Sequence, residues 1–299
     1  MRPWRDHLEA DDPLVGDGRP GAPGLGVAGT LLHRWSARWS DDPGARLWQE
    51  GGHWWTADEF DAATRRAAGR LRAAGLEPGQ RIVWSTGSSV AALATHVGAL
   101  RAGLVVVPAN PAYSERELAH IVTDVRASAA VVGRPDQARW VRDATPDGIV
   151  VCGPDLDLAD GDPGVLDVAG PDDPAMICFT SGTTGAPKGA VLRHRNLLAG
   201  VESVTRAWRM SPDDLLVHSL PLFHAHGLVV GAYGTMTAGA SAVLLPGFDP
   251  DAVADTVRAE AATLFFGVPT MFHRLVAGGR ATDLARLRLC VSGSAPLPA

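Results

Sequence analysis

Apolar residues recur along the chain at two spacings, one typical of helices and one of buried strands. Phe60, Ala67 and Leu71 follow the helical spacing, and Thr56 and Glu59 form a capping box that begins this helix. Further helices are expected at 89–102 and 115–124, and short apolar strands at 81–85, 104–108 and 129–132. Because helices and strands alternate, we predict an α/β fold of layered, mostly parallel sheets flanked by helices.

The chain is expected to divide into three parts. Residues 1–27 are polar and rich in Pro and Gly, a composition that predicts a loose leader. For residues 28–170 we expect an N-terminal α/β subdomain. For residues 171–299 we expect a second, incomplete subdomain that carries the phosphate loop and the acyl pocket. An acidic stretch at 155–167 is expected to be a solvated loop between the two subdomains. A solvated helix face is likewise expected for the basic cluster of Arg66, Arg70 and Arg72.

Composition narrows the class of protein. Apolar residues make up 46% of the chain and charged residues 20%, as in ordinary soluble globular proteins. A net charge of −6 disfavours nucleic-acid and anionic-membrane partners, which select basic surfaces. Three widely spaced cysteines indicate neither a disulfide framework nor a zinc site and fit a reducing cytoplasm. Residues 227–248 are uncharged and long enough to span a bilayer, but their glycines and proline favour a buried helix, a turn and a strand at 241–245.

The single lysine of the chain, Lys188, lies in the sequence Thr-Ser-Gly-Thr-Thr-Gly-Ala-Pro-Lys-Gly at 180–189. Small residues let backbone N–H groups converge on an anion, so this sequence is typical of a phosphate-binding loop. The predicted donors around Lys188 are Thr180, Ser181, Gly182, Thr183, Thr184 and Gly185. The alternative is a flexible hairpin whose lysine faces solvent.

The elements around this loop differ from those of a Walker A motif. Strands are expected at 175–179 and 189–192, and the next helix begins only near residue 195. A Walker A loop runs directly into a helix and follows its lysine with Ser or Thr, whereas Gly189 follows Lys188 here. A kinase or GTPase of the usual kind is therefore disfavoured.

A second group of candidate residues lies in the last third of the chain. A buried strand at 263–266 is followed by Pro269, which suits the first turn of a helix, and Arg274 lies in that helix among apolar neighbours. An arginine there is expected to bind an anion such as a second substrate carboxylate, or alternatively to reach solvent from an amphipathic helix. His224 and His226 would share one face of a strand, but no third ligand stands nearby, so we predict no metal site.

Several ordered motifs together resemble the acyl-adenylate-forming superfamily of acyl-CoA synthetases, adenylation domains and luciferases. They are the sequences at 99–110, 113–124, 180–189, 220–228 and 289–298. Within the superfamily, the sequences at 220–228, 266–274 and 291–295 are most similar to the malonyl-CoA synthetases. The resemblance implies an ATP-dependent acid–CoA ligase that uses Mg²⁺, ATP, coenzyme A and a small carboxylate, with malonate or methylmalonate as the expected acid. The implied reaction has two steps and passes through an acyl-adenylate.

The resemblance also implies roles for individual residues. Lys188 and its loop would hold the β- and γ-phosphates of ATP, and Ser292 with Gly293 would lie beside the nucleotide. Arg274 would bind the distal carboxylate of the acid, whereas His224 would border the acyl pocket and gate it. His226 would lie near the substrate carboxylate, with Ser294 as a hydroxyl donor. For either histidine a purely structural role is the alternative.

The sequence departs from the superfamily at its end. The superfamily's Tyr-Gly-x-Thr-Glu segment, ribose-binding aspartate and small C-terminal domain with its catalytic lysine do not occur within residues 1–299. We therefore expect an N-terminal portion that turns over little substrate alone. The alternatives are another acyl- or aryl-CoA ligase of the superfamily and a catalytically incomplete nucleotide-binding fragment.

Overall fold

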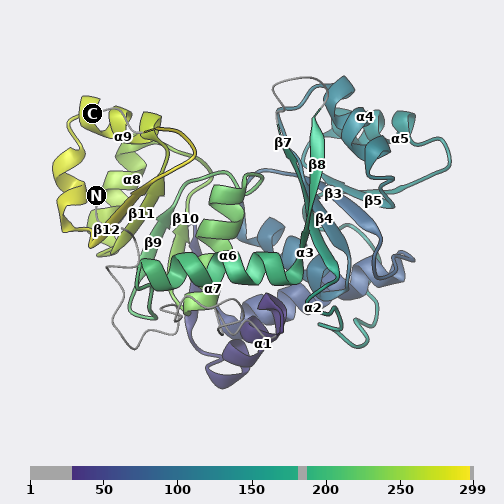
Figure 1. Ribbon diagram of the computed structural model, residues 1–299, viewed down its shortest axis with the longest axis horizontal. Coiled ribbons are helices and arrows are strands. Elements are labelled where there is room, and N and C mark those ends of the chain that lie inside the picture. Colours follow the sequence, from purple (N-terminus) through teal and green to yellow (C-terminus); the bar gives the residue numbers. More distant parts are fainter. Residues whose placement is uncertain (1–28, 181–186, 297–299) are drawn as a thin grey trace, which may run out of the picture.

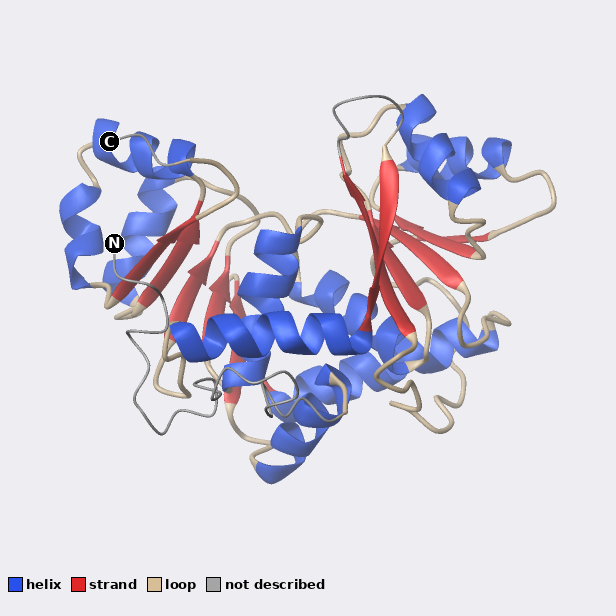
Figure 2. Ribbon diagram, in the orientation of Figure 1, coloured by secondary structure: helices blue, strands red, loops and turns tan. Residues whose placement is uncertain are grey.

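Two six-stranded sheets form the frame of the protein (Figures 1 and 2). The computed structural model describes residues 29–180 and 187–296, so the predicted leader at 1–27 lies outside it. The first sheet has the order β12-β11-β9-β10-β1-β2 and the second the order β6-β5-β3-β4-β7-β8. All recorded strand pairs are parallel except β1 with β2 and β7 with β8. The predicted α/β fold with mostly parallel sheets is therefore confirmed.

The strands of the first sheet, called sheet A here, are β1 (Arg46–Glu50), β2 (His53–Thr56), β9 (Leu215–His218), β10 (Ser241–Leu244), β11 (Leu264–Gly267) and β12 (Leu289–Ser292). Those of the second, sheet B, are β3 (Arg81–Ser85), β4 (Val105–Pro108), β5 (Ala129–Val132), β6 (Val150–Cys152), β7 (Pro174–Thr180) and β8 (Lys188–Arg193). The division of the strands between the two sheets does not follow the sequence order at residue 170. Strands β1 and β2 belong to sheet A with β9 to β12, and β7 and β8 belong to sheet B with β3 to β6.

The helices pack in three layers around the sheets. They are α1 (Leu31–Asp41), α2 (Ala57–Ala73), α3 (Val90–Arg101), α4 (Glu115–Asp124), α5 (Pro135–Ala144), α6 (His194–Ala207), α7 (Gly234–Ala238), α8 (Pro250–Ala259) and α9 (Pro269–Ala277), with a π-helix, η2 (His226–Tyr233), and a 3₁₀-helix, η3 (Ala281–Arg286). The capping box of α2 is confirmed, because Thr56 and Glu59 satisfy each other's backbone N–H groups.

Strand residues alternate between two kinds of core, as the period of a β-strand requires. In sheet B, Val83 packs outward in a cluster with residues of α4, whereas its neighbour Trp84 points into the central layer. In sheet A, Phe265 packs outward toward α8 and α9, and Phe266 points inward. Helices α1, α2, α3 and α6 therefore share one central core with both sheets, and Figure 1 shows α6 running from the side of sheet A to sheet B.

The acidic stretch at 155–167 is not merely solvated, because it docks on the basic cluster of α2. Arg70 donates from Nε to Asp160 Oδ1 at 2.7 Å and from its Nη1 to the carbonyl oxygens of Asp155 and Leu156 at 3.0 Å each. Arg72 binds two further carbonyl oxygens of the loop. The expectation of a solvated helix face was wrong for Arg70 and Arg72, because a loop lying on the protein needs donors for its carbonyl groups.

The segment at 227–248 has the predicted order of a buried helix, a turn and a strand. The helical part is η2 followed by α7, and β10 supplies the strand. Gly239 makes the turn with φ +72°, a conformation that favours glycine. Within residues 29–180 and 187–296, no helix is long and apolar enough to cross a membrane.

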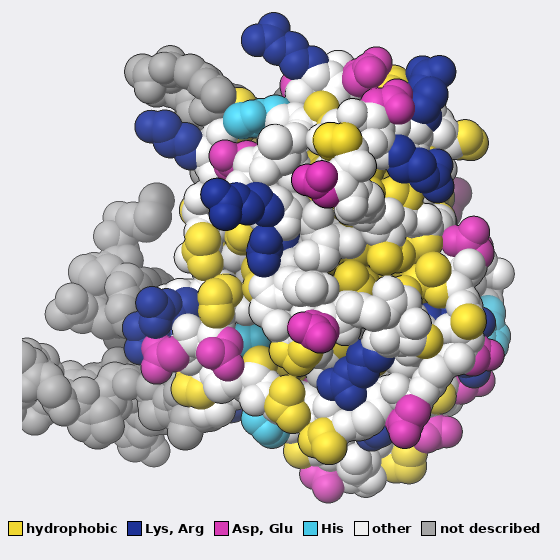
Figure 3. Space-filling view, turned by 90° about the vertical axis from the view of Figure 1, so that its right-hand side faces the viewer, with side chains coloured by type: hydrophobic (Ala, Val, Ile, Leu, Met, Phe, Trp, Pro, Cys, Tyr) yellow, Lys and Arg dark blue, Asp and Glu magenta, His cyan; other side chains and the backbone are white. Residues whose placement is uncertain are grey.

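The surface on the side of sheet B and α4 carries charges of both signs. Figure 3 shows basic and acidic side chains interspersed over this face, with hydrophobic side chains between them. Mixed charges of this kind are typical of an ordinary solvated surface.

Candidate functional site

The predicted phosphate loop connects two antiparallel strands of sheet B. Thr180 and Lys188 pair across the base of the loop, at the end of β7 and the start of β8. Lys188 is exposed there. The predicted donors Ser181, Gly182, Thr183, Thr184 and Gly185 lie outside the described residues. The prediction that the loop joins two strands and precedes a helix by several residues is confirmed, since α6 begins only at His194.

The strand register explains the glycine that follows the lysine. A Cβ at Gly189 would lie 2.7 Å from Cγ2 of Ile177 and 3.4 Å from the ring of Phe179, both on β7. A side chain at this position would push the two strands apart below the loop. Gly189 therefore lets β7 and β8 lie close together at the residue that follows Lys188.

One residue that the sequence did not single out contacts the loop. His120 on α4 donates from Nε2 to the carbonyl oxygen of Pro187 at 3.3 Å. Its ring lies edge-on to Phe179 at a centroid distance of 6.3 Å. Helix α4 thus supports the lysine end of the loop from the side. No spacing rule connects a helix residue at 120 with a loop at 187, so only the tertiary structure reveals this contact.

The carboxyl ends of the sheet A strands gather the second group of predicted residues. His226 follows β9, and Ser292, Gly293 and Ser294 end or follow β12. Nδ1 of His226 lies 3.2 Å from the hydroxyl oxygen of Ser294. A Cβ at Gly293 would lie 2.9 Å from Cε1 of His226, so only glycine lets the ring approach this closely. Open α/β sheets bind ligands at this edge.

His224 and His226 are not on a strand, so the expectation that they share one face was wrong. His224 lies in the bend after β9, and His226 begins η2. Residues two apart in a helical backbone point to different sides. The His224 ring lies 4.5 Å from the ring of Phe223 and is exposed at its other side. No group of three or more His, Cys, Asp or Glu side chains suited to a metal ion occurs in the described part of the chain.

Arg274 lies on α9, the helix that follows the carboxyl end of β11, as predicted. Its side chain is exposed rather than enclosed by apolar neighbours. The guanidinium carbon lies 5.0 Å from the ring centroid of Phe248, a cation–π contact. The expectation that Arg274 lies among apolar side chains was wrong, because the adjacent Leu275 occupies the buried side of this short helix. Stacking on a ring leaves the guanidinium N–H groups able to bind an anion.

A contact between loops joins the two sheets near this group. The backbone N–H of Leu222, in the turn that leads to His224, donates to the hydroxyl of Ser88 at 3.3 Å. Ser88 lies in the loop between β3 and α3, at the carboxyl end of a sheet B strand. Loops from the carboxyl ends of both sheets therefore meet here.

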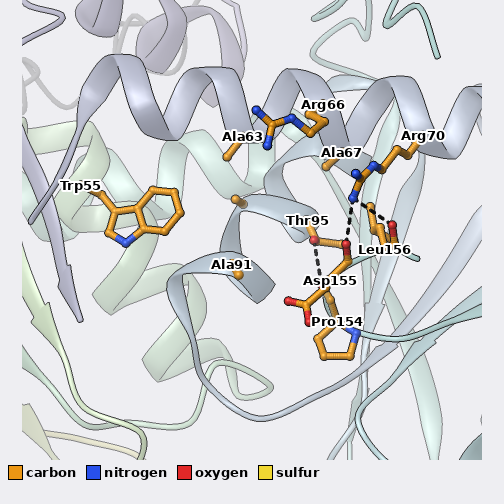
Figure 4. A pocket seen from close by; sticks show the side chains of 11 residues that line it. Trp55, Ala63, Arg66, Ala67, Arg70, Ala91, Thr95, Pro154, Asp155 and Leu156 are labelled. Atoms are coloured by element: carbon orange, nitrogen blue, oxygen red, sulfur yellow. Dashed lines mark hydrogen bonds between the residues drawn. The ribbon is translucent and has the colours of Figure 1, made fainter. Parts of the chain in front are cut away.

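Three cavities of the described structure lie away from these residues. Figure 4 shows one of about 150 Å³ between α2 and α3, with Trp55 at one side and Asp155 at the other. A second, of about 330 Å³, lies beside α5 and includes Arg134 and Arg142. A third, of about 480 Å³, lies on α1. Neither Lys188 nor His226 lines any of the three.

Comparison with known proteins identifies the family. The sequence profile of the AMP-binding enzymes matches residues 32–299. The chain belongs to this family. The resemblance to adenylate-forming enzymes that the motifs indicated is thereby confirmed.

Individual relatives agree on the family and differ in the acid that their names specify. The chain is 36% identical over 260 residues to a feruloyl-CoA synthase of Amycolatopsis sp, an alignment that covers 86% of this chain and 52% of the relative. It is 31% identical over 241 residues to the mitochondrial malonate–CoA ligase of Mus musculus, which covers 73% of this chain and 41% of the relative.

A solved structure shows the same fold. ATP-bound MatB from Rhodopseudomonas palustris matches with a TM-score of 0.80 and 35% sequence identity, over 91% of this chain and 56% of that chain. The chain thus spans about half the length of the AMP-binding relatives it matches.

The site environment sets the charge of His226. Burial lowers the pKa of its imidazole below the usual value, so the ring is neutral at neutral pH and Nδ1 can share a hydrogen bond with Ser294. We predict that an NMR pH titration of the folded chain places the His226 midpoint below the ordinary value of about 6.5. In urea the midpoint should return to about 6.5. A folded-state midpoint at or above the urea value would contradict this environment.

Proposed function

We propose that the chain is the nucleotide- and acid-binding portion of an ATP-dependent acid–CoA ligase whose acid is malonate or methylmalonate. The contact of His226 with Gly293 and Ser294 carries the proposal, since these residues meet at the ligand-binding edge of sheet A. The similarity to a malonate–CoA ligase supports the substrate class, and the similarity to ATP-bound MatB supports the nucleotide.

The reaction would have two steps. A carboxylate oxygen of the acid attacks the α-phosphorus of ATP, and pyrophosphate leaves as the acyl-adenylate forms. The thiolate sulfur of coenzyme A then attacks the acyl carbon, and AMP leaves as the thioester forms. The first step brings two anions together, so the residues of this chain would act mainly by neutralising charge and by positioning.

Each predicted residue would have one task in these steps. Lys188 and its loop would hold the β- and γ-phosphates, where one charge pair at about 4 Å contributes on the order of 4 kcal/mol at intermediate dielectric. Arg274 would bind the distal carboxylate through N–H groups that its stacking on Phe248 leaves accessible. His226 and Ser294 would orient the acid, and His224 would border the acyl pocket.

Magnesium would enter with the nucleotide. Mg²⁺ commonly binds substrate phosphates together with only one or two carboxylates. We also propose a cytoplasmic enzyme, in keeping with the free thiols of Cys152, Cys178 and Cys290.

An aryl acid is the second candidate substrate. The 36% identity to a feruloyl-CoA synthase favours it, as does the aromatic ring of Phe248 below Arg274. An aryl acid has no distal carboxylate, so Arg274 would contribute little to its binding. The dependence of acid affinity on Arg274 therefore separates the two candidates.

We predict that Arg274→Ala weakens malonate binding by about 10- to 100-fold, the range expected for the loss of a charged hydrogen-bonding partner. ATP binding should stay within about twofold, because no ATP contact is assigned to Arg274. Isothermal titration of each ligand measures both affinities. His273→Ala, which removes the neighbouring exposed side chain of the same helix, is the control and should change neither. Equal losses of malonate and ATP in Arg274→Ala would mean that the arginine supports folding instead.

We predict that Lys188→Ala weakens ATP binding by roughly tenfold or more, since a charge-assisted contact to phosphate is lost. Lys188→Arg keeps the charge but replaces a point ammonium with a planar fork, so it should restore part of the affinity. The melting temperature without ligand should stay within about 2 °C, because the side chain is exposed. A large fall in melting temperature, with ATP affinity unchanged, would contradict the phosphate role.

A further inference from the structure

The π-helix η2 has His226 as its first residue and Tyr233 as its last. π-Helices are rare, because their backbone geometry is less favourable than that of an α-helix, and they concentrate at functional sites. Tertiary contacts must therefore hold eight residues in this form. Those contacts also decide where the His226 ring lies.

Two glycines let the π-helix pack closely against its neighbours. A Cβ at Gly227 would lie 2.3 Å from the carbonyl oxygen of Pro221, so the helix presses directly on the turn before it. A Cβ at Gly231 would lie 2.9 Å from Cε1 of His218, a fully buried residue at the end of β9. These contacts join the helix to sheet A.

The last residue of the π-helix is tied to the other half of the molecule. The hydroxyl of Tyr233 and Nε2 of His96 on α3 form a hydrogen bond, and both side chains are buried. The His96 ring lies 4.9 Å from the ring of Trp84 on β3, a sheet B strand. On its other side, the Tyr233 ring meets Trp35 of α1 edge-on at 5.0 Å. The contacts of Tyr233 with His96 and Trp35 thus extend across the central layer of helices.

Both partners of this bond are neutral at physiological pH. Burial lowers the pKa of His96 to about 3. Burial also raises the pKa of the Tyr233 hydroxyl well above its usual value, with a smaller electrostatic contribution from Cys178 on β7. Within the described residues no other hydrogen-bond partner faces Nε2 of His96, so loss of the hydroxyl would leave this nitrogen buried and unsatisfied.

We propose that the His96–Tyr233 hydrogen bond holds the π-helix in register and thereby positions His226 at the acid site. His96 and Tyr233 are positioning residues, since neither touches the site itself. The positioning claim needs no ligand, whereas the role of His226 toward the acid rests on the proposed function. The two claims can therefore fail separately.

Tyr233→Phe tests the proposal, because it removes the hydroxyl and keeps the ring. We expect amide hydrogens of residues 228–232 to exchange roughly tenfold faster or more, since a local opening becomes easier. The NMR titration midpoint of His226 should move toward the ordinary value of about 6.5 as its ring becomes more exposed. Tyr113→Phe removes the only other tyrosine hydroxyl of the chain and should leave both readouts unchanged.

A second pair of variants tests the bond from its other side. His96→Gln keeps a polar group at a similar reach, so it should retain the slow amide exchange and the low His226 titration midpoint of the wild-type chain. His96→Leu should lose both. This pair decides the question if Tyr233→Phe fails to fold. Rescue by a conservative replacement distinguishes a specific hydrogen bond from general packing of the core.

Four outcomes distinguish the two claims. Wild-type exchange and an unchanged His226 midpoint in folded Tyr233→Phe would overturn the proposal, as would equal behaviour of His96→Gln and His96→Leu. If malonate fails to move the His226 signal of the wild-type chain, the proposed acid role fails but the positioning claim stands. If malonate moves that signal in the wild type and about tenfold more is needed in Tyr233→Phe, both claims are supported.

Discussion

Close packing of two helices between the sheets is the constraint on which the rest of the structure depends. Gly98 on α3 faces α2 so tightly that a Cβ there would lie 2.6 Å from the carbonyl oxygen of Thr64 and 2.7 Å from Cβ of Ala67. Sheet B packs on one side of the central layer and sheet A on the other. The close packing of α3 on α2 therefore fixes the distance between the two sheets. The loops at their carboxyl ends meet at that distance, where Leu222 contacts Ser88.

The central layer also connects the site to the core through polar groups. Arg101 on α3 is 2% exposed and pairs with Asp61 of α2 and with Asp167 at the end of the acidic loop. Buried charges of this kind are stable only when every partner is in place. The same helix carries His96, whose bond to Tyr233 reaches the π-helix. Helix α3 thus contacts both sheets and, through the His96–Tyr233 hydrogen bond, the π-helix that begins at His226.

The sequence predicted local features well, because local rules decide them. The capping box at Thr56 and Glu59, the strands flanking Lys188 and the helix begun by Pro269 all follow from spacing and from residue type. The ordered motifs predicted the family for the same reason: they are contiguous.

Tertiary features could not be predicted in this way. The pairing of β1 with β10 joins residues about 190 positions apart, and no local pattern selects that partner. The exposure of Arg274 depends on which side of a nine-residue helix Leu275 occupies. The contact of His120 with Pro187 and the π-helical form of 226–233 likewise depend on packing that the sequence pattern does not express.

The central claim is that the loop at Lys188 and the edge at His226 serve one adenylation reaction on a small diacid. Exchange of labelled pyrophosphate into ATP, measured with the full-length protein that contains this chain, tests it most directly. Malonate or methylmalonate should support the fastest exchange, and ferulate and a medium-chain fatty acid should support little. Rapid exchange with ferulate or the fatty acid, and none with either diacid, would contradict the claim.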